Sequence, residues 1–291
     1  MQITASMVKE LREKTGAGMM DCKKALQETN GDIEKAIDYL REKGMAQAQK
    51  KQGRIAAEGL CNVVQNGNEA VIYELNSETD FVAKNEKFIN LINEVGEIII
   101  NSKANNTDEA LAAEKNGKTI DTILADATST IGEKISLRRV SRVVKAAEEG
   151  FGIYLHQGGR IAVLTVLAKA DDVVAKDLAM HIAAQNPRFI DRSEIDEETI
   201  AHETQILRQQ ALNEGKPENI VDKMVVGRLN KYLQDICLVD QPYVKDPDQK
   251  VSQYLKTNNN SVKSFIRLNV GEGIEKREED FAAEVAAQLK K

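Results

Sequence analysis

The chain has 291 residues, of which 42% are hydrophobic, 30% are charged and 4% are aromatic, with no tryptophan. This length and composition predict two or three globular domains and argue against a disordered protein. The formal net charge of −6 gives the chain no general attraction to nucleic-acid phosphates. We therefore expect no direct contact with nucleic acid.

The three cysteines, Cys22, Cys61 and Cys237, are far apart, odd in number and without a C-x-x-C pair. This spacing argues against a disulfide framework or a zinc site and indicates free thiols in a reducing cytoplasm. The first residues are a charged amphipathic segment unlike a signal peptide, and no apolar run approaches the roughly 20 residues that cross a bilayer. We expect a cytoplasmic protein that does not associate with membranes.

Residues 4–44 predict three short helices. The second ends at Asn30-Gly31, and Asp32 is a suitable N-cap for the third. A bundle this small is marginally stable alone, and residues 45–56 predict a linker after it, which could be helical at its start. The apolar positions at helical spacing, which we expect to face inward, are Val8, Leu11, Met19, Cys22, Leu26, Ile33, Ala36, Ile37 and Leu40.

Two later stretches resemble each other at a constant offset, so that Val71 corresponds to Val163 and Val82 to Val174. We interpret this as an internal duplication. Each copy predicts two strands joined by a glycine-containing turn and then a helix. The strands are expected at 59–65 and 71–75 in the first copy and at 152–156 and 161–167 in the second. The predicted fold class is α+β, with two duplicated units built on antiparallel sheets.

Residues 193–236 interrupt the second copy and predict an antiparallel coiled-coil hairpin that turns at Gly215-Lys216-Pro217. Such a hairpin could serve a dimer, a partner or only itself. Its apolar positions are Ile200, Ile206, Leu207, Ala211, Ile220, Val221, Met224, Val225, Leu229, Tyr232, Leu233 and Ile236.

The chain returns to strand character at 262–270 and ends in a predicted helix over 277–290. The narrow apolar stripe of this helix, with Phe281 and Val285 at its centre, requires a groove in this protein or in another.

Motifs for catalysis are missing. The sequence contains no P-loop, no dinucleotide fingerprint and no G-x-S-x-G elbow. His156, His181 and His202 have no partner at metal-ligand spacing, since Ile206 occupies the fifth position of the incomplete H-E-x-x-H motif that begins at His202. We expect His181 in a core or a subunit contact. The sequence predicts a protein that is not an enzyme and needs neither metal nor cofactor.

A wholly polar stretch, residues 76–80, ends the second strand and is followed at once by Phe81. Thr79 or Asp80 could cap the next helix. Phe81 has two interpretations: it packs beside Phe88 in the core, or it projects as an anchor into a partner. The duplicate has Val173 at the matching position, so the fold itself does not require phenylalanine there.

Three runs now carry a resemblance that covers essentially the whole chain: T-G-A-G-M-M-D-C-K-K-A-L at 15–26, E-T-D-F-V-A-K-N at 78–85 and V-G-E-G-I-E-K at 270–276. In these motifs the chain resembles the bacterial elongation factor Ts family. The resemblance implies a guanine-nucleotide exchange factor for elongation factor Tu, the GTPase of translation elongation. The alternative class is a non-catalytic, chaperone-like scaffold.

The resemblance also implies the parts of the partner-binding surface. A domain at 1–54, similar to a ubiquitin-associated domain, and the helical module at 271–291 would hold the nucleotide-binding domain of the GTPase. Their contact residues would be Lys9, Arg12, Met19 and Met20, with weaker candidates Phe281 and Val285; alternatively, one of the two methionines lies in the core.

The turn Thr79-Asp80-Phe81-Val82, in a subdomain at 55–144, would enter near the magnesium site of the GTPase. There Phe81 would act as a wedge and Asp80 would make polar contacts. The second subdomain, at 145–270, would touch a more distal domain of the partner, with His156 a weak candidate. The family resemblance also allows a homodimer or a 2:2 complex.

Overall fold

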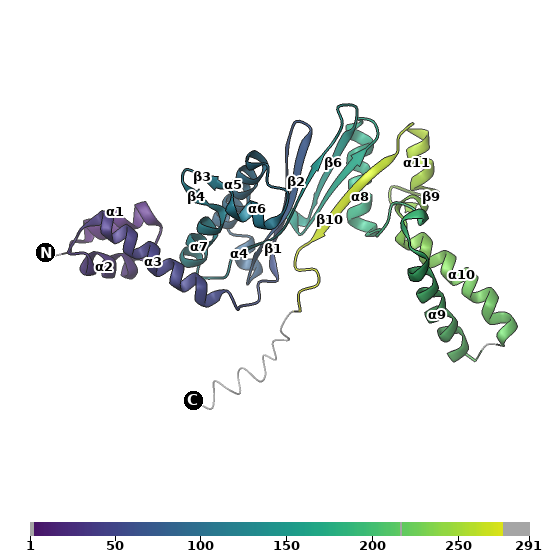
Figure 1. Ribbon diagram of the computed structural model, residues 1–291, viewed down its shortest axis with the longest axis horizontal. Coiled ribbons are helices and arrows are strands. Elements are labelled where there is room, and N and C mark those ends of the chain that lie inside the picture. Colours follow the sequence, from purple (N-terminus) through teal and green to yellow (C-terminus); the bar gives the residue numbers. More distant parts are fainter. Residues whose placement is uncertain (1–2, 216, 276–291) are drawn as a thin grey trace. The chain divides into compact units, whose positions relative to one another are not determined.

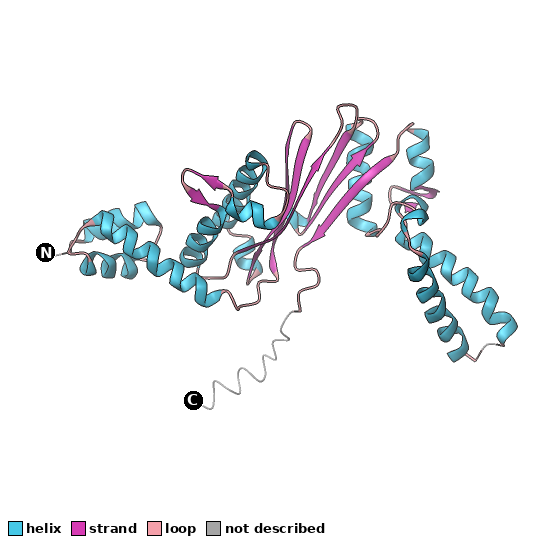
Figure 2. Cartoon of the chain, in the orientation of Figure 1, coloured by secondary structure: helices cyan, strands magenta, loops and turns pink. Residues whose placement is uncertain are grey.

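The computed structural model describes residues 3–215 and 217–275. The chain forms two compact units, one of Met1–Val143 with Leu268–Lys291 and one of Val144–Arg267, and helices and strands contribute to both (Figures 1 and 2). The predicted α+β class is confirmed, while the finer division at residues 54, 144 and 270 stays a prediction. The helix expected at 277–290 lies outside the described residues.

The first unit begins with three helices, α1 (Ala5–Thr15), α2 (Met19–Glu28) and α3 (Ile33–Lys51). The Asp32 side chain caps α3 by accepting from the Lys35 N–H, as the sequence predicts. The core of this bundle is Leu11, Cys22, Ala25, Leu26 and Ala36.

One expectation for the bundle is wrong. Met19 does not face inward, because it begins α2 and the buried stripe starts one turn later at Cys22; its exposed fraction is 57% and that of Met20 is 75%. Neither methionine is therefore a core residue. Helix α3 continues to Lys51, so the predicted linker is helical in its first part, as the sequence allows.

The sheet of the first unit has the order β1-β2-β5, from β1 (Glu58–Asn66), β2 (Glu69–Ser77) and β5 (Ser136–Val144). The predicted antiparallel pair β1–β2 runs from Glu58 opposite Ser77 to Asn66 opposite Glu69. As the central strand, β2 is buried along almost its whole length. The third strand was not foreseen in the sequence.

Helices α4 (Asp80–Ala83), α5 (Glu86–Ser102), α6 (Thr107–Ala112) and α7 (Ile120–Ile131) complete the first unit, with a small ribbon of β3 (Glu114–Lys115) and β4 (Lys118–Thr119). Tyr73 of β2 donates to the Ile92 carbonyl at 2.7 Å. Gly96 allows this close approach, because a Cβ there would lie 2.1 Å from the Tyr73 hydroxyl. Packing of α3 on α7 joins the helical bundle to this core.

The second unit repeats the plan of the first. Strands β6 (Gly150–His156), β7 (Ile161–Leu167) and β10 (Val262–Asn269) form a sheet of order β10-β7-β6 under helix α8 (Asp172–Gln185). The remaining elements are three 3-10 turns, η1 (Gln157–Gly159), η2 (Arg192–Glu194) and η3 (Leu238–Asp240), a β8–β9 ribbon (Pro242–Tyr243 and Asp246–Lys250) and α11 (Val251–Thr257). The strands and the helix lie where the duplication predicts.

The interruption of this unit is a helical hairpin of α9 (Glu197–Asn213) and α10 (Glu218–Ile236), as predicted. Its seam is Leu207, Ala211, Val221 and Val225. Ile206 and Ile220, which the apolar pattern includes, are 38% and 44% exposed, because two helices bury only one seam between them. Ion pairs Arg208–Asp222 and Arg228–Glu214 link the two arms outside it.

Within residues 3–215 and 217–275, no helix is both long and apolar enough to cross a bilayer.

His181 is a fully buried core residue of the second unit, which resolves the two alternatives in favour of the core. The Val244 N–H donates to its Nδ1 at 3.1 Å, so the imidazole is neutral and its Nε2 donates to Gln241 Oε1 at 2.9 Å. Burial lowers the pKa of His181, although the bond to Gln241 acts the other way. Protonation of Nδ1 would place its N–H against the N–H of Val244.

We expect the second unit to lose stability as the pH falls below the ordinary imidazole pKa of about 6.5. The unfolded chain then binds a proton that the folded chain excludes, so stability present above that pH is lost below it. Thermal unfolding at about pH 7.5 and about pH 5.5 should show a larger decrease for the wild type than for a His181→Gln variant. Equal decreases in the two proteins would contradict this role of His181.

Candidate partner-binding site

The turn that leaves β2 is held by a single carboxylate. Glu133, in the loop after α7, accepts from the N–H of Glu78 at 3.1 Å and from the N–H of Thr79 at 2.9 Å. Its other oxygen accepts from the Thr79 hydroxyl at 2.7 Å. Hydrogen bonds to a charged acceptor are stronger than neutral ones, so Glu133 fixes the backbone where the strand becomes a helix.

Thr79 also starts the helix that follows. Its hydroxyl accepts from the Val82 N–H at 3.3 Å, and the residue has extended backbone angles typical of an N-cap. Helix α4 then lasts only from Asp80 to Ala83. Asn85 returns to extended angles and caps α5 by accepting from the Lys87 N–H. The chain therefore forms two helices where the sequence predicts one.

This break decides the position of Phe81. On one continuous helix Phe81 and Phe88 would lie seven residues apart on the same face. In the structure Phe88 is fully buried in the first core, while the Phe81 side chain has an exposed fraction of 83%. The interpretation of Phe81 as a core residue is wrong, and the large aromatic ring projects from the tip of a rigid turn.

The neighbours of Phe81 divide between solvent and core. Asp80 pairs with Lys84 at 2.6 Å on the exposed side. Val82 packs against the first core and Ala83 is buried within it. The predicted site Thr79–Val82 is thus one short element. It exposes the Phe81 ring and the Asp80 carboxylate, and Val82 attaches it to the first core.

A second group of polar contacts ties this turn to the end of α3. The Lys134 N–H donates to Glu78 Oε1 at 2.6 Å, and its Nζ donates to the carbonyls of Gln52 and Arg54 at 2.6 and 3.0 Å. Arg54 in turn pairs with Glu78 at 3.3 Å. Glu133 and Lys134 were missed in the sequence, because nothing local marks a loop residue as the support of a turn more than fifty positions earlier.

A Glu133→Gln substitution tests this support. The amide oxygen can still accept the two N–H groups, but the NH2 group then faces the Thr79 hydroxyl, which donates to the other carboxylate oxygen, so the turn should lose part of its fixed position. Losing about 1.4 kcal/mol of preorganisation corresponds to tenfold in an equilibrium constant, and we expect partner-dependent activity to fall roughly tenfold. Lys115→Gln, on the exposed β3–β4 ribbon, is the control, and a Glu133→Gln protein with wild-type activity would contradict the assignment.

The predicted residues of the helical bundle all lie on its surface. Lys9 and Arg12 are exposed one turn apart on α1, and Lys9 lies 3.9 Å from Glu13. Met19 and Met20 are exposed at the start of α2. Exposed methionines provide flexible apolar contact surface, and these four side chains are accessible to a partner.

The remaining candidates are less informative. His156 ends β6, is half-buried and lies 3.3 Å from the Tyr154 hydroxyl through Nδ1. It belongs to the second unit, whereas the other described candidates belong to the first. Phe281 and Val285 lie outside the described residues. Among residues 3–215 and 217–275, no three His, Cys, Asp or Glu side chains are grouped as metal ligands are.

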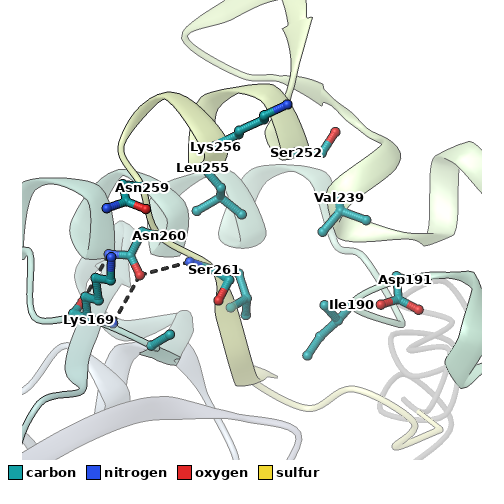
Figure 3. Close-up of a pocket in the computed structure, with 12 residues that line it drawn as sticks. Lys169, Ile190, Asp191, Val239, Ser252, Leu255, Lys256, Asn259, Asn260 and Ser261 are labelled. Carbon is teal, nitrogen blue, oxygen red and sulfur yellow. Dashed lines mark hydrogen bonds between the residues drawn. The ribbon is translucent and has the colours of Figure 1, made fainter.

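A cavity of about 530 Å³ opens in the second unit between α11 and the loops at 168–169, 190–191 and 259–262. Leu255 and Val239 face it, Lys169 and Lys256 lie at its rim, and Asn260 hydrogen-bonds Lys169 and Ser261 across one end (Figure 3). Among the residues that the structure describes, no predicted site residue lines this cavity.

Comparisons with known proteins agree on one family. A family model described as "Elongation factor TS" matches residues 78–272, which include the turn at 79–82. Elongation factor Ts of Acholeplasma laidlawii (strain PG-8A) is 58% identical over 296 residues, which cover 100% of both chains.

Proposed function

Because the chain belongs to the elongation factor Ts family, with a role in translation elongation, we propose that it is the guanine-nucleotide exchange factor of its elongation factor Tu. The observation that supports this most directly is the 83% exposed Phe81 on a one-turn helix that begins at the turn held by Glu133. An exposed aromatic on a preorganised support is typical of a binding hot spot.

In the proposed mechanism the Thr79–Val82 turn enters the GTPase beside its nucleotide site. The Phe81 ring separates helices of the partner and Asp80 makes polar contacts there. Coordination of magnesium and phosphate is disturbed, and GDP leaves. The exchange factor makes and breaks no covalent bond, so it needs no acid, base or nucleophile of its own and acts as a binding protein.

The energetics follow from linkage. A protein that binds the nucleotide-free GTPase more tightly than the GDP-loaded form weakens GDP binding by the same ratio. A rigid wedge provides this difference, because its contacts are complete only when the nucleotide site is open. GTP binding to the empty site then weakens the grip of the factor on the GTPase and releases it.

The other candidate residues would supply affinity without opening the site. Lys9, Arg12, Met19 and Met20, together with Phe281 and Val285 of the C-terminal module, would hold the nucleotide-binding domain. His156 would touch a more distal domain, and the α9–α10 hairpin would serve self-association or an accessory contact in a homodimer or 2:2 complex. The cycle would take place in the cytoplasm, with no bound cofactor and no contact with nucleic acid or membrane.

Release of a fluorescent GDP analogue from the cognate elongation factor Tu, followed by stopped flow, tests the proposal. We expect strong acceleration at substoichiometric protein, because each molecule acts repeatedly. Binding of the GTPase with an unchanged release rate would instead support the scaffold alternative and overturn the exchange mechanism.

A further inference from the structure

A single helix connects the two groups of candidate contact residues in the first unit. Near its start, α3 supplies Ala36 to the bundle core, and Ile33 packs against that core. Farther along, α3 packs on α7, where a Cβ added to the buried Gly44 would lie 3.0 Å from the Ser129 hydroxyl. The helix that belongs to the bundle therefore also lies against a helix of the first core (Figure 1).

The loop after α7 fastens the end of this helix. Lys51, the last residue of α3, donates through Nζ to the Gly132 carbonyl at 2.7 Å. In the other direction, Lys134 Nζ donates to the carbonyls of Gln52 and Arg54 at 2.6 and 3.0 Å. Carbonyls at a helix C-terminus have no partner within the helix and attract cations. The two lysines thus bind the loop and the end of α3 to each other.

The same loop, residues 132–134, also holds the turn that precedes α4. Glu133 accepts from the N–H groups of Glu78 and Thr79. The Lys134 N–H donates to the Glu78 carboxylate at 2.6 Å. Lys134 therefore binds the turn through its backbone and the end of α3 through its side chain, so the side chain can be changed while the backbone bond is kept.

A stiff link between two binding surfaces changes what the second surface can do. Once the bundle is bound to a partner, a fixed link holds the turn at a high effective concentration beside its own site. Binding energy gained at the remote surface then helps to open the nucleotide site, whereas a loose link would lose it to independent motion of the two parts. The loop at 132–134 is placed to provide this stiffness, because it binds both α3 and the turn.

We propose that Lys134 is a positioning residue for nucleotide exchange, which couples the bundle surface of Met19 and Met20 to the turn that carries Phe81. This inference rests on the proposed function and explains how two contact surfaces of the first unit act together. Lys134 needs no contact with the GTPase, because its effect passes through the end of α3 to the bundle.

A double-mutant cycle in the full chain tests this coupling. Lys134→Met keeps an unbranched side chain and the backbone bond to Glu78 but removes the ammonium group. At limiting concentrations of the chain we expect it to slow GDP release from elongation factor Tu roughly fivefold, the lower end of typical coupling between sites. In a chain that already carries Met19→Ala and Met20→Ala, the same substitution should change the release rate little, because the bundle has lost its apolar contacts with the partner.

Three outcomes of this cycle would overturn the inference. Equal slowing by Lys134→Met in both backgrounds would show that the ammonium group only stabilises the turn. Unchanged release by the chain with Met19→Ala and Met20→Ala would show that the bundle supplies no binding to be coupled. The control is Lys118→Met, because Lys118 pairs with Asp126 at 2.8 Å between two elements of the core. Equal slowing by this control would show a general effect of a lost surface charge.

A second variant acts from the helix side of the contact. Lys51→Met removes the bond to the Gly132 carbonyl and leaves the bonds of Glu133 to the turn in place. We expect the same pattern as for Lys134→Met, with slower release in the wild-type background and little change in the methionine-deficient one. A chain that carries both Lys51→Met and Lys134→Met and releases GDP at the wild-type rate would contradict the proposal.

The distance between the bundle and the core gives a measurement that does not depend on the GTPase. Spin labels can be attached after Glu28→Cys in α2 and Glu94→Cys in α5, because both positions are exposed and the three native cysteines are buried. Pulsed electron resonance should show a broader distribution of distances in Lys134→Met than in Lys118→Met. Equal widths would overturn the positioning role. A wild-type chain that fails to accelerate GDP release would overturn the proposed function instead, so the two failures are distinguishable.

Discussion

Replacing Phe81 with alanine is expected to slow GDP release by roughly 30-fold or more, the effect of about 2 kcal/mol that marks a binding hot spot. The free energy of unfolding should change by less than about 0.5 kcal/mol, as is usual for surface substitutions, because the ring makes little contact with its own protein at 83% exposure. Stopped-flow release and urea unfolding on the same preparation measure the two quantities.

The duplicated unit offers a matched control for Phe81. Val173 occupies the corresponding position at the start of α8 and is 70% exposed, so Val173→Ala removes an exposed apolar side chain from the same local setting. We expect near-wild-type release from this variant. A wild-type rate of GDP release with Phe81→Ala, or an equal decrease of the rate in both variants, would contradict the role of Phe81 as a wedge.

Replacing Phe88 with alanine is expected to have the opposite profile. Phe88 is fully buried among Leu75, Ile92 and the other residues of the first core. Removing a buried phenylalanine side chain costs about 3–5 kcal/mol through lost apolar burial and the remaining cavity. Urea unfolding should show this loss as a lower midpoint with little change in slope.

The comparison of these two phenylalanines tests the break between α4 and α5. If Phe81→Ala destabilises the unit as much as Phe88→Ala does, the two rings share the core, and the single continuous helix suggested by the sequence is correct. A small cost for Phe81 and a large one for Phe88 would support the separate caps at Thr79 and Asn85.

Local patterns in the sequence determined most of the elements. The three N-terminal helices, the Asp32 cap, the strand pairs of both copies and the α9–α10 hairpin lie where periodicity and turn residues predict. These features depend on neighbours a few positions apart. The duplication predicts the same order of two strands and a helix in both units. The resemblance to a family also predicts a partner-binding role for the Thr79–Val82 turn, and that role stays a prediction.

The tertiary structure alone decided how that turn is built and supported. The second cap at Asn85 separates Phe81 from Phe88, and the support from Glu133 comes from a loop more than fifty residues away. The exposure of both Met19 and Met20, the third strand β5 and the attachment of α3 to the loop at 132–134 were equally invisible in the sequence. Periodicity reports which side chains a single element can bury, whereas these features depend on which distant segments meet, and a linear pattern does not contain that information.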